Sequence, residues 1–267
     1  MLDHLLVVIL RDVVRYRINV IRTNLLGSFD YPSGRTLQSD IHGYYHFLAK
    51  LIREILLQPT KKLFDQKIQL IPSPDLDQWL REGKSVIVVS AHLGNWEWAG
   101  IYLGMKYPGQ VCALYKRIKS ELINNWMVQR RKSTLDHLIE IGKMGELLRL
   151  IRHKNVLILM IADQNPGSDQ GIIWVPFFGR ETAFINGPET LATKYKLPVV
   201  FLHVSATPES GYQLGFEIIS NGNEILSAGE ITRRYAILLE KNIKAMRTQW
   251  LWSHRRWKRI KSIGHRA

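Results

Sequence analysis

The chain has 267 residues, 46% of them hydrophobic, which is enough to bury a substantial core, and we expect residues 1–267 to form one domain. Its 37 lysines and arginines outnumber 23 aspartates and glutamates, so the formal net charge is +14. This charge predicts an anionic partner: nucleic acid, an acidic membrane surface or a phosphorylated lipid. The single cysteine, Cys112, excludes a disulfide framework and fits a reducing compartment.

The amino-terminal residues 1–25 combine leucine, valine and isoleucine with four arginines. The apolar run from Leu5 to Leu10 is far shorter than the roughly 20 residues that span a bilayer. The segment therefore predicts either a helix lying on a membrane surface or an ordinary helix packed on the core. No small-residue cleavage site follows the run, so we expect no secretory signal peptide.

The rest of the chain alternates between helical and strand patterns. Helical patterns occupy 36–57, part of 72–82, 121–132, 145–153, 187–196 and 232–246. Apolar strand patterns occupy 85–90, 111–115, 156–162 and 198–206, and 212–220 alternates as an edge hairpin partner would. Buried strands separated by helices predict an α/β fold, in which helices flank a central mixed, mostly parallel sheet.

The most informative motif follows the predicted strand at 85–90, where His92, Asn95 and Glu97 come in close succession. In open α/β sheets, ligands bind beyond the carboxyl ends of the strands. Five helical positions separate two side chains by about 140°. His92 and Glu97 can therefore meet only if His92 lies in the turn and Glu97 in the first turn of the next helix, with Gly94 giving the backbone room to bend.

A carboxylate on one imidazole nitrogen would fix the tautomer of His92 and leave the other nitrogen to accept a proton. The spacing thus predicts a general base with its orienting acid. The same spacing also fits a second interpretation, in which His92 is a buried structural histidine and Glu97 an ordinary helix-start glutamate.

The residues around this pair resemble a motif of a known enzyme family. Ala91 to Glu97, AHLGNWE, resembles the His-x4-Glu signature of the late lipid A acyltransferases, the Kdo-dependent lauroyl and myristoyl transferases. His-x4-Asp/Glu alone is shared with glycerol-phosphate acyltransferases, whereas the HxGNWE form is far more specific. Further blocks resemble the family in the family's order, over nearly the whole chain: Tyr16-Arg17 with Asn24-Leu25, Asp163-Gln164, Val175 to Arg180, Gly187-Pro188 with Leu191-Ala192, and Gln249 to Trp257.

The resemblance implies transfer of a fatty acyl group from acyl carrier protein to a hydroxyl of a Kdo-bearing lipid A precursor in lipopolysaccharide synthesis. It places the enzyme at the cytoplasmic face of the inner membrane of a Gram-negative-type bacterium. In that mechanism His92 is the general base on the acceptor hydroxyl, and Glu97 orients and charge-stabilises it. No covalent acyl-enzyme, cofactor or metal is implied, and His42 and His46 have no third ligand in sequence.

Several further residues are expected to bind substrate. Asp163 and Gln164 follow the predicted strand at 156–162 and would face the same crevice as His92, although a turn or cap role for Asp163 is the alternative. Asn95, inside the HxGNWE motif, is a further expected substrate contact.

Lys116 and Arg117 follow the predicted strand at 111–115 and resemble the family's YRP element. Lys116 stands in the place of the arginine and Arg117 in that of the proline. Either residue could contact an acceptor phosphate or the forming oxyanion, and a solvated strand end is the structural alternative.

Residues 250–267 contain six lysines or arginines, no acidic residue, and the tryptophans Trp250, Trp252 and Trp257. This composition predicts a basic-aromatic tail at an anionic membrane surface. Single-stranded nucleic acid would suit the same residues, but no RRM, KH or zinc pattern is present, so we expect no nucleic-acid partner. The Phe177-Phe178-Gly179 stretch is expected to line an acyl groove.

Two other functions remain open from the sequence. One is acyl transfer to a phosphatidylinositol mannoside or an aminolipid. The other is a non-catalytic peripheral membrane-binding protein whose His-Glu pair is structural. A serine hydrolase or nucleotide-binding function lacks its motif, because the chain contains no GxSxG, P-loop or GxGxxG sequence.

Overall fold

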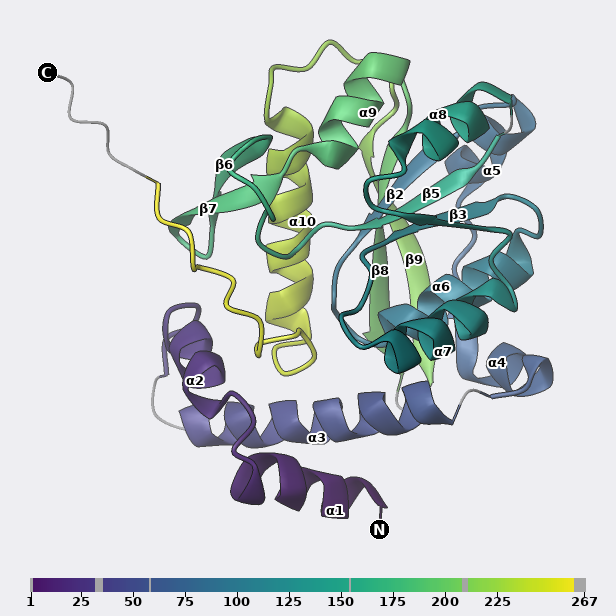
Figure 1. Ribbon diagram of the computed structural model, residues 1–267. Helices are drawn as coiled ribbons and strands as arrows, with labels where there is room; N and C mark the ends of the chain where they lie inside the picture. Colours follow the sequence, from purple (N-terminus) through teal and green to yellow (C-terminus); the bar gives the residue numbers. More distant parts are fainter. Residues whose placement is uncertain (1, 32–35, 58, 154, 208–210, 262–267) are drawn as a thin grey trace, which may run out of the picture.

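The computed structural model describes residues 2–31, 36–57, 59–153, 155–207 and 211–261 (Figure 1). Its large sheet contains β1 (Ile68–Leu70), β2 (Val86–Ser90), β3 (Val111–Tyr115), β4 (His137–Glu140), β5 (Leu157–Ile161), β8 (Val199–Ala206) and β9 (Tyr212–Ser220). The strand order is β1-β9-β8-β2-β5-β3-β4. Every neighbouring pair is parallel except β8 and β9, which are antiparallel. The predicted α/β fold with a mixed, mostly parallel sheet is confirmed.

Helices surround this sheet in the part of the chain that the structure describes (Figure 1). They are α1 (Leu2–Val8), α2 (Ile18–Leu26), α3 (Leu37–Leu56), α4 (Lys61–Lys67), α5 (Pro74–Arg81), α6 (Trp96–Lys106), α7 (Glu121–Lys132), α8 (Met144–His153), α9 (Gly187–Tyr195) and α10 (Glu230–Ala245). The long helix α3 begins as its sequence predicts, because the Thr36 hydroxyl accepts a hydrogen bond from the Ser39 amide at 3.1 Å and caps the first turn.

Strand β2 lies in the middle of the sheet, and all of its residues are buried. Successive side chains of a strand point to opposite faces. Ile87 and Val89 accordingly belong to one apolar core, with α3, α9 and α10, whereas Val86 and Val88 belong to a second core, with α5 and α6. Both faces of the sheet are covered at this strand, so its residues form a nearly continuous apolar run. This run explains why the sequence predicts the strand clearly.

The position of β9 in the sheet differs from the prediction. Strand β9 pairs with β8 as the expected hairpin partner, but it is not an edge strand, because the short strand β1 pairs with its outer side.

The amino-terminal segment is not one continuous helix. After α1 the chain forms a π-helical turn, η1 (Ile9–Val13), and α2 begins only at Ile18. Arg15 and Arg17 lie between them with left-handed φ values of 51° and 52°, which interrupt the helix. Helix α1 contacts α3 and buries Val7. Apolar side chains remain exposed at Leu2, Leu5, Ile9, Val13 and Val14.

Among the residues that the structure describes, no helix is both long enough and apolar enough to cross a bilayer.

Residues 172–185 form an antiparallel hairpin of β6 (Ile172–Phe177) and β7 (Arg180–Ile185) that the sequence analysis did not predict. Phe178 and Gly179 form its two-residue turn, both with positive φ, as such turns require. Phe177 is fully buried and its ring lies 6.0 Å from the rings of Trp250 and Trp257. These phenylalanines therefore belong to a closed aromatic core and do not line an open groove.

The carboxyl-terminal segment that follows α10 is also part of the core. Trp250 and Trp252 are only 2% and 0% exposed, so the prediction that they meet a membrane interface is wrong. The segment is held from the amino-terminal side, because the amide of Asn24 donates to the carbonyls of Trp252 and His254 at 2.8 and 2.7 Å. Composition alone did not reveal that α2 and α3 cover this stretch.

Candidate active site

The candidate site lies at the carboxyl ends of β2 and β5. The two strands are parallel neighbours, with Ser90 opposite Ile161. His92 and Asp163 each follow two residues later, so the same register that pairs the strands brings these two side chains together. The sheet topology thus places both residues at the same edge of the sheet, where ligands bind in open α/β folds.

His92 and Asp163 form a hydrogen-bonded pair. The Nδ1 atom of His92 lies 2.7 Å from Oδ1 of Asp163, and the backbone amide of His92 donates to Oδ2 at 2.9 Å. The indole of Trp250 donates to the same Oδ2 at 2.7 Å. Asp163 is almost completely buried, whereas a fifth of the His92 side chain is exposed. The carboxylate is therefore fixed inside the protein, whereas the imidazole is partly exposed.

The charge of Asp163 decides which ring nitrogen can act as a base. Burial on its own would raise the pKa of Asp163, but the nearby His92 and the hydrogen bonds from His92 and Trp250 outweigh burial and lower this pKa. The ionised carboxylate can only accept, so Nδ1 of His92 donates to it and Nε2 keeps its lone pair. The amide nitrogen of Gln164 lies 3.4 Å from Nε2.

The turn that carries His92 is fixed by the carboxyl-terminal segment. The amide of Leu251 donates to the carbonyl of His92, and the amide of Gly94 donates to that of Gln249, both at 3.0 Å. Gly94 has a φ of +60°, and a Cβ atom there would come within 2.8 Å of the Val204 carbonyl oxygen. The turn thus requires glycine at this position.

Glu97 lies in the first turn of α6, as predicted, but its carboxylate does not meet His92 in the described residues. It forms a two-pronged ion pair with Arg131 of α7, at 2.6 and 3.0 Å, in a mostly buried position. The orienting carboxylate that we expected at Glu97 is Asp163 in this structure. The physical reason is that parallel β2 and β5 place Asp163 beside the ring, while the guanidinium fork of Arg131 matches the geometry of Glu97.

Asn95 is fully buried and belongs to the framework of the turn. Its side-chain oxygen accepts from the Trp98 amide at 3.0 Å and caps α6, and its amide nitrogen donates to Glu54 at 2.9 Å. Glu54 also accepts from the Tyr212 hydroxyl at 2.6 Å. Both ends of the Asn95 amide are thus engaged by protein, and the substrate contact expected of it stays a prediction.

Lys116 and Arg117 follow β3 at the same edge of the sheet. Strand β3 lies two positions from β2, which separates their ends by about 10 Å. Both side chains are exposed, and Arg117 bonds to Glu121 at 3.1 Å. The structure therefore places this pair at the same edge of the sheet as His92, without a bond to His92 among the described residues.

Sequence reasoning missed two residues that support the pair, Trp250 and Arg256. Arg256 is 1% exposed, and its guanidinium lies 4.2 Å from the ring centre of Phe184. Burial lowers the pKa of Arg256 to about 10, against the opposing effect of the Asp163 charge, so the guanidinium stays positively charged at neutral pH. Both residues belong to the block from Gln249 to Trp257, where the resemblance was the available signal.

Comparison with known families decides the identity. The sequence model of the bacterial lipid A biosynthesis acyltransferases matches residues 41–259, which include His92, Asp163 and Trp250. The chain belongs to this family. It is therefore an acyltransferase of lipid A and lipopolysaccharide biosynthesis. A search of curated proteins found no match.

For an acyltransferase of this family, the geometry of the site suits proton removal by His92. A histidine whose Nδ1 is bonded to a buried carboxylate and whose Nε2 keeps its lone pair can remove a proton from a hydroxyl group. The Gln164 amide nitrogen lies 3.4 Å from Nε2, so it is near the nitrogen that such a hydroxyl would approach.

Proposed function

We propose that this acyltransferase, as one catalytic domain spanning residues 1–267, moves a fatty acyl group from acyl carrier protein to a hydroxyl of a lipid A precursor. The family match supports acyl transfer in this biosynthesis. The observation that carries the proposed mechanism is the Nδ1 bond of His92 to the buried Asp163, which leaves the lone pair of Nε2 to accept a proton.

In the proposed reaction, Nε2 of His92 takes the proton of the acceptor hydroxyl while the hydroxyl oxygen attacks the thioester carbonyl carbon. The new carbon–oxygen bond gives a tetrahedral oxyanion. Its collapse breaks the carbon–sulfur bond, and the departing thiolate takes the proton back from Nε2. The carboxylate of Asp163 stabilises the imidazolium between these steps, and its interactions with His92 and the hydrogen bond from Trp250 keep that carboxylate ionised.

Glu97 acts on this centre through α6 in the proposal. Its two-pronged bond to Arg131 joins the start of α6 to α7. Because the chain passes from His92 into α6 within four residues, this ion pair positions the turn that carries the base. Lys116 and Arg117, at the same edge of the sheet, remain proposed contacts for the acceptor phosphate or the oxyanion.

The proposed place of action is the cytoplasmic face of the inner membrane, where the acyl carrier protein and the lipid precursor meet. The exposed apolar side chains of α1 and η1 support attachment to a bilayer surface, because such groups gain free energy when they leave water. The net charge of +14 supports attraction to anionic lipid and to an acidic carrier protein.

The test is acyl transfer by the purified full chain from an acyl carrier protein thioester to a lipid A precursor, with the product identified by mass spectrometry. The His92→Ala variant should lose about 10²–10⁴-fold in kcat, the usual contribution of a general base, with an unchanged unfolding transition. Near-normal turnover by a folded His92→Ala protein would contradict the proposed mechanism. Absence of transfer by the unmodified chain to any lipid A precursor would contradict the proposed function.

A further inference from the structure

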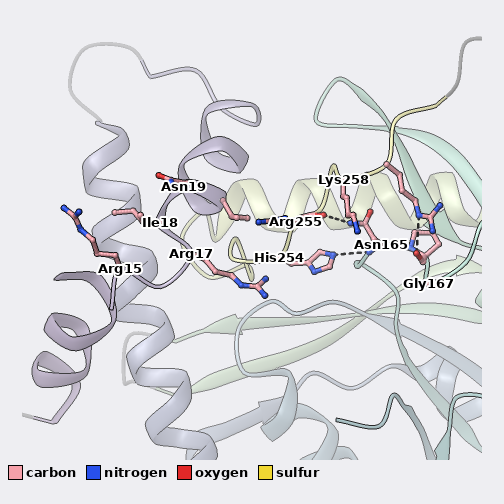
Figure 2. A pocket seen from close by; sticks show the side chains of 12 residues that line it. Arg15, Arg17, Ile18, Asn19, Asn165, Gly167, His254, Arg255 and Lys258 are labelled. Atoms are coloured by element: carbon pink, nitrogen blue, oxygen red, sulfur yellow. Dashed lines mark hydrogen bonds between the residues drawn. The ribbon is translucent and has the colours of Figure 1, made fainter. Parts of the chain in front are cut away.

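A large basic cavity lies next to the candidate active site, between the amino-terminal segment and the carboxyl-terminal segment (Figure 2). Its volume is about 1070 Å³. One wall comes from residues 15–20 and the other from residues 254–259, and residues 165–167 join them. Its cationic side chains are Arg15, Arg17, Arg255, Lys258 and Arg259.

The charge of this cavity is largely unbalanced. No aspartate or glutamate is among its lining residues. Arg259 is paired with Asp169, and Arg17 donates to the Ser253 carbonyl at 2.9 Å. Within the described ranges, no carboxylate forms an ion pair with Arg15, Arg255 or Lys258. Three long cationic side chains are thus available to an incoming anion, and arginine in particular binds phosphate through two parallel hydrogen bonds.

The walls of the cavity are held rigidly around these charges. The Asn165 amide donates to Nε2 of His254 at 3.2 Å, and the Asn165 side chain donates to the Arg255 carbonyl. Burial lowers the pKa of His254 to about 4, so at neutral pH the ring is uncharged and accepts this bond. A site whose walls are already ordered binds its ligand at a smaller entropic cost.

The cavity and the catalytic residues share one loop. Asn165 directly follows Gln164, whose amide lies 3.4 Å from Nε2 of His92, and Asp163 precedes them both. A ligand held by the cavity would therefore extend its neighbouring groups toward the catalytic base.

Exposed apolar side chains lie beside the cationic residues on both walls of the cavity. Val13 and Val14, which precede Arg15, are 71% and 60% exposed, and Ile260, which follows Arg259, is 87% exposed. Cations bordered by apolar side chains suit a lipid surface, where headgroup anions lie beside acyl chains. This arrangement favours a lipid headgroup over the phosphate of a soluble donor.

We propose that this cavity is the subsite for the phosphorylated sugar headgroup of the acceptor lipid, with Arg15, Arg255 and Lys258 as its phosphate-binding residues. The proposal rests on the proposed function, since it names where that acceptor is held. It assigns the cavity to the acceptor and leaves the donor to another surface.

The direct test is binding of the full chain, without donor, to phosphatidylcholine vesicles that contain a bisphosphorylated lipid A precursor. A second vesicle set contains the same lipid after phosphatase treatment. The variant R15Q/R255Q/K258Q should bind the phosphorylated vesicles about tenfold or more weakly, because hydrogen bonds to charged groups contribute strongly. On the dephosphorylated vesicles, the variant and the unmodified chain should bind equally.

The matched control is K61Q/K62Q/K143Q, which removes the same charge from α4 and from the segment before α8, outside the cavity lining. It should retain most of the binding to phosphorylated vesicles. Equal loss in both variants would mean that net charge alone attracts the protein, and it would overturn the subsite. Binding by R15Q/R255Q/K258Q that equals that of the unmodified chain would overturn it as well.

Steady-state kinetics separate acceptor from donor. The R15Q/R255Q/K258Q variant should raise the KM for the phosphorylated acceptor and leave the KM for acyl carrier protein unchanged. The reverse result would assign the cavity to the phosphate of the donor's pantetheine arm and contradict the proposal. Vesicle binding requires no turnover, so failure of the acyl transfer assay and failure of the subsite are distinguishable.

Discussion

Asp163 of the proposed catalytic pair and part of the lining of the basic cavity lie in the same loop, 163–167, but the charge of Asp163 is satisfied by protein and those of the cavity are not. Asp163 is buried and receives hydrogen bonds from the His92 ring, the His92 amide and the Trp250 indole. Arg255 and Lys258 are exposed and have no carboxylate partner in the described part of the chain. This difference fits the proposed roles, because a carboxylate that orients a base must hold one geometry, whereas side chains proposed to bind a ligand need free hydrogen-bonding groups.

This comparison predicts that substitutions at the turn that carries His92 destabilise the fold most. In Gly94→Ala the methyl group meets the Val204 carbonyl and the left-handed φ is strained. We expect a loss of about 2 kcal/mol or more in the free energy of unfolding, measured by chemical denaturation. The control is Gly83→Ala, where φ is +78° but nothing lies within 4 Å of the added atom. Equal losses in the two variants would show that backbone strain alone matters at Gly94.

The next effect concerns the indole that donates to Asp163. Trp250→Phe removes a hydrogen bond to a buried charge, and we expect about a tenfold fall in kcat together with a loss of stability. The control is Trp252→Phe, which removes an equally buried indole whose donor bonds to the Arg247 carbonyl. It should lose stability and keep most of its activity. Similar kcat values for the two variants would mean that the Trp250 bond does not act on catalysis.

The smallest effect on stability is expected at the cavity. Because Arg15, Arg255 and Lys258 are exposed and have no ion pair with the described residues, R15Q/R255Q/K258Q should change the free energy of unfolding by less than about 0.5 kcal/mol per site. Thermal and chemical unfolding measure this directly. A large destabilisation would mean that these side chains support the fold, and the contrast between the two regions would fail.

The sequence was sufficient for the features that depend on local pattern. The apolar run at 85–90 predicted the central strand, and the turn and helix start that follow it placed His92 and Glu97 correctly. Asp163 was placed at the same edge of the sheet as His92 because it follows another buried strand. These inferences need only the alternation of elements and the rule that parallel strands end at one edge.

Features that depend on long-range packing could not be predicted from the sequence. The partner of Glu97 is Arg131, thirty-four positions away on another helix. Trp250 and Trp252 looked like interface residues, because composition does not reveal which helices cover them. Strands β1 and β4 have only three and four residues, too few for a periodic signal.

The central claim is that Asp163 orients the catalytic histidine, and the most direct test compares kcat for Asp163→Asn and Glu97→Gln. Asparagine cannot accept as a carboxylate does and favours the wrong imidazole tautomer, so Asp163→Asn should lose about 10³–10⁴-fold. Glu97→Gln weakens only the ion pair with Arg131, and it should lose about tenfold or less. Both variants should first show a cooperative unfolding transition. If Glu97→Gln lost far more activity than Asp163→Asn, the assignment of the orienting carboxylate would be wrong.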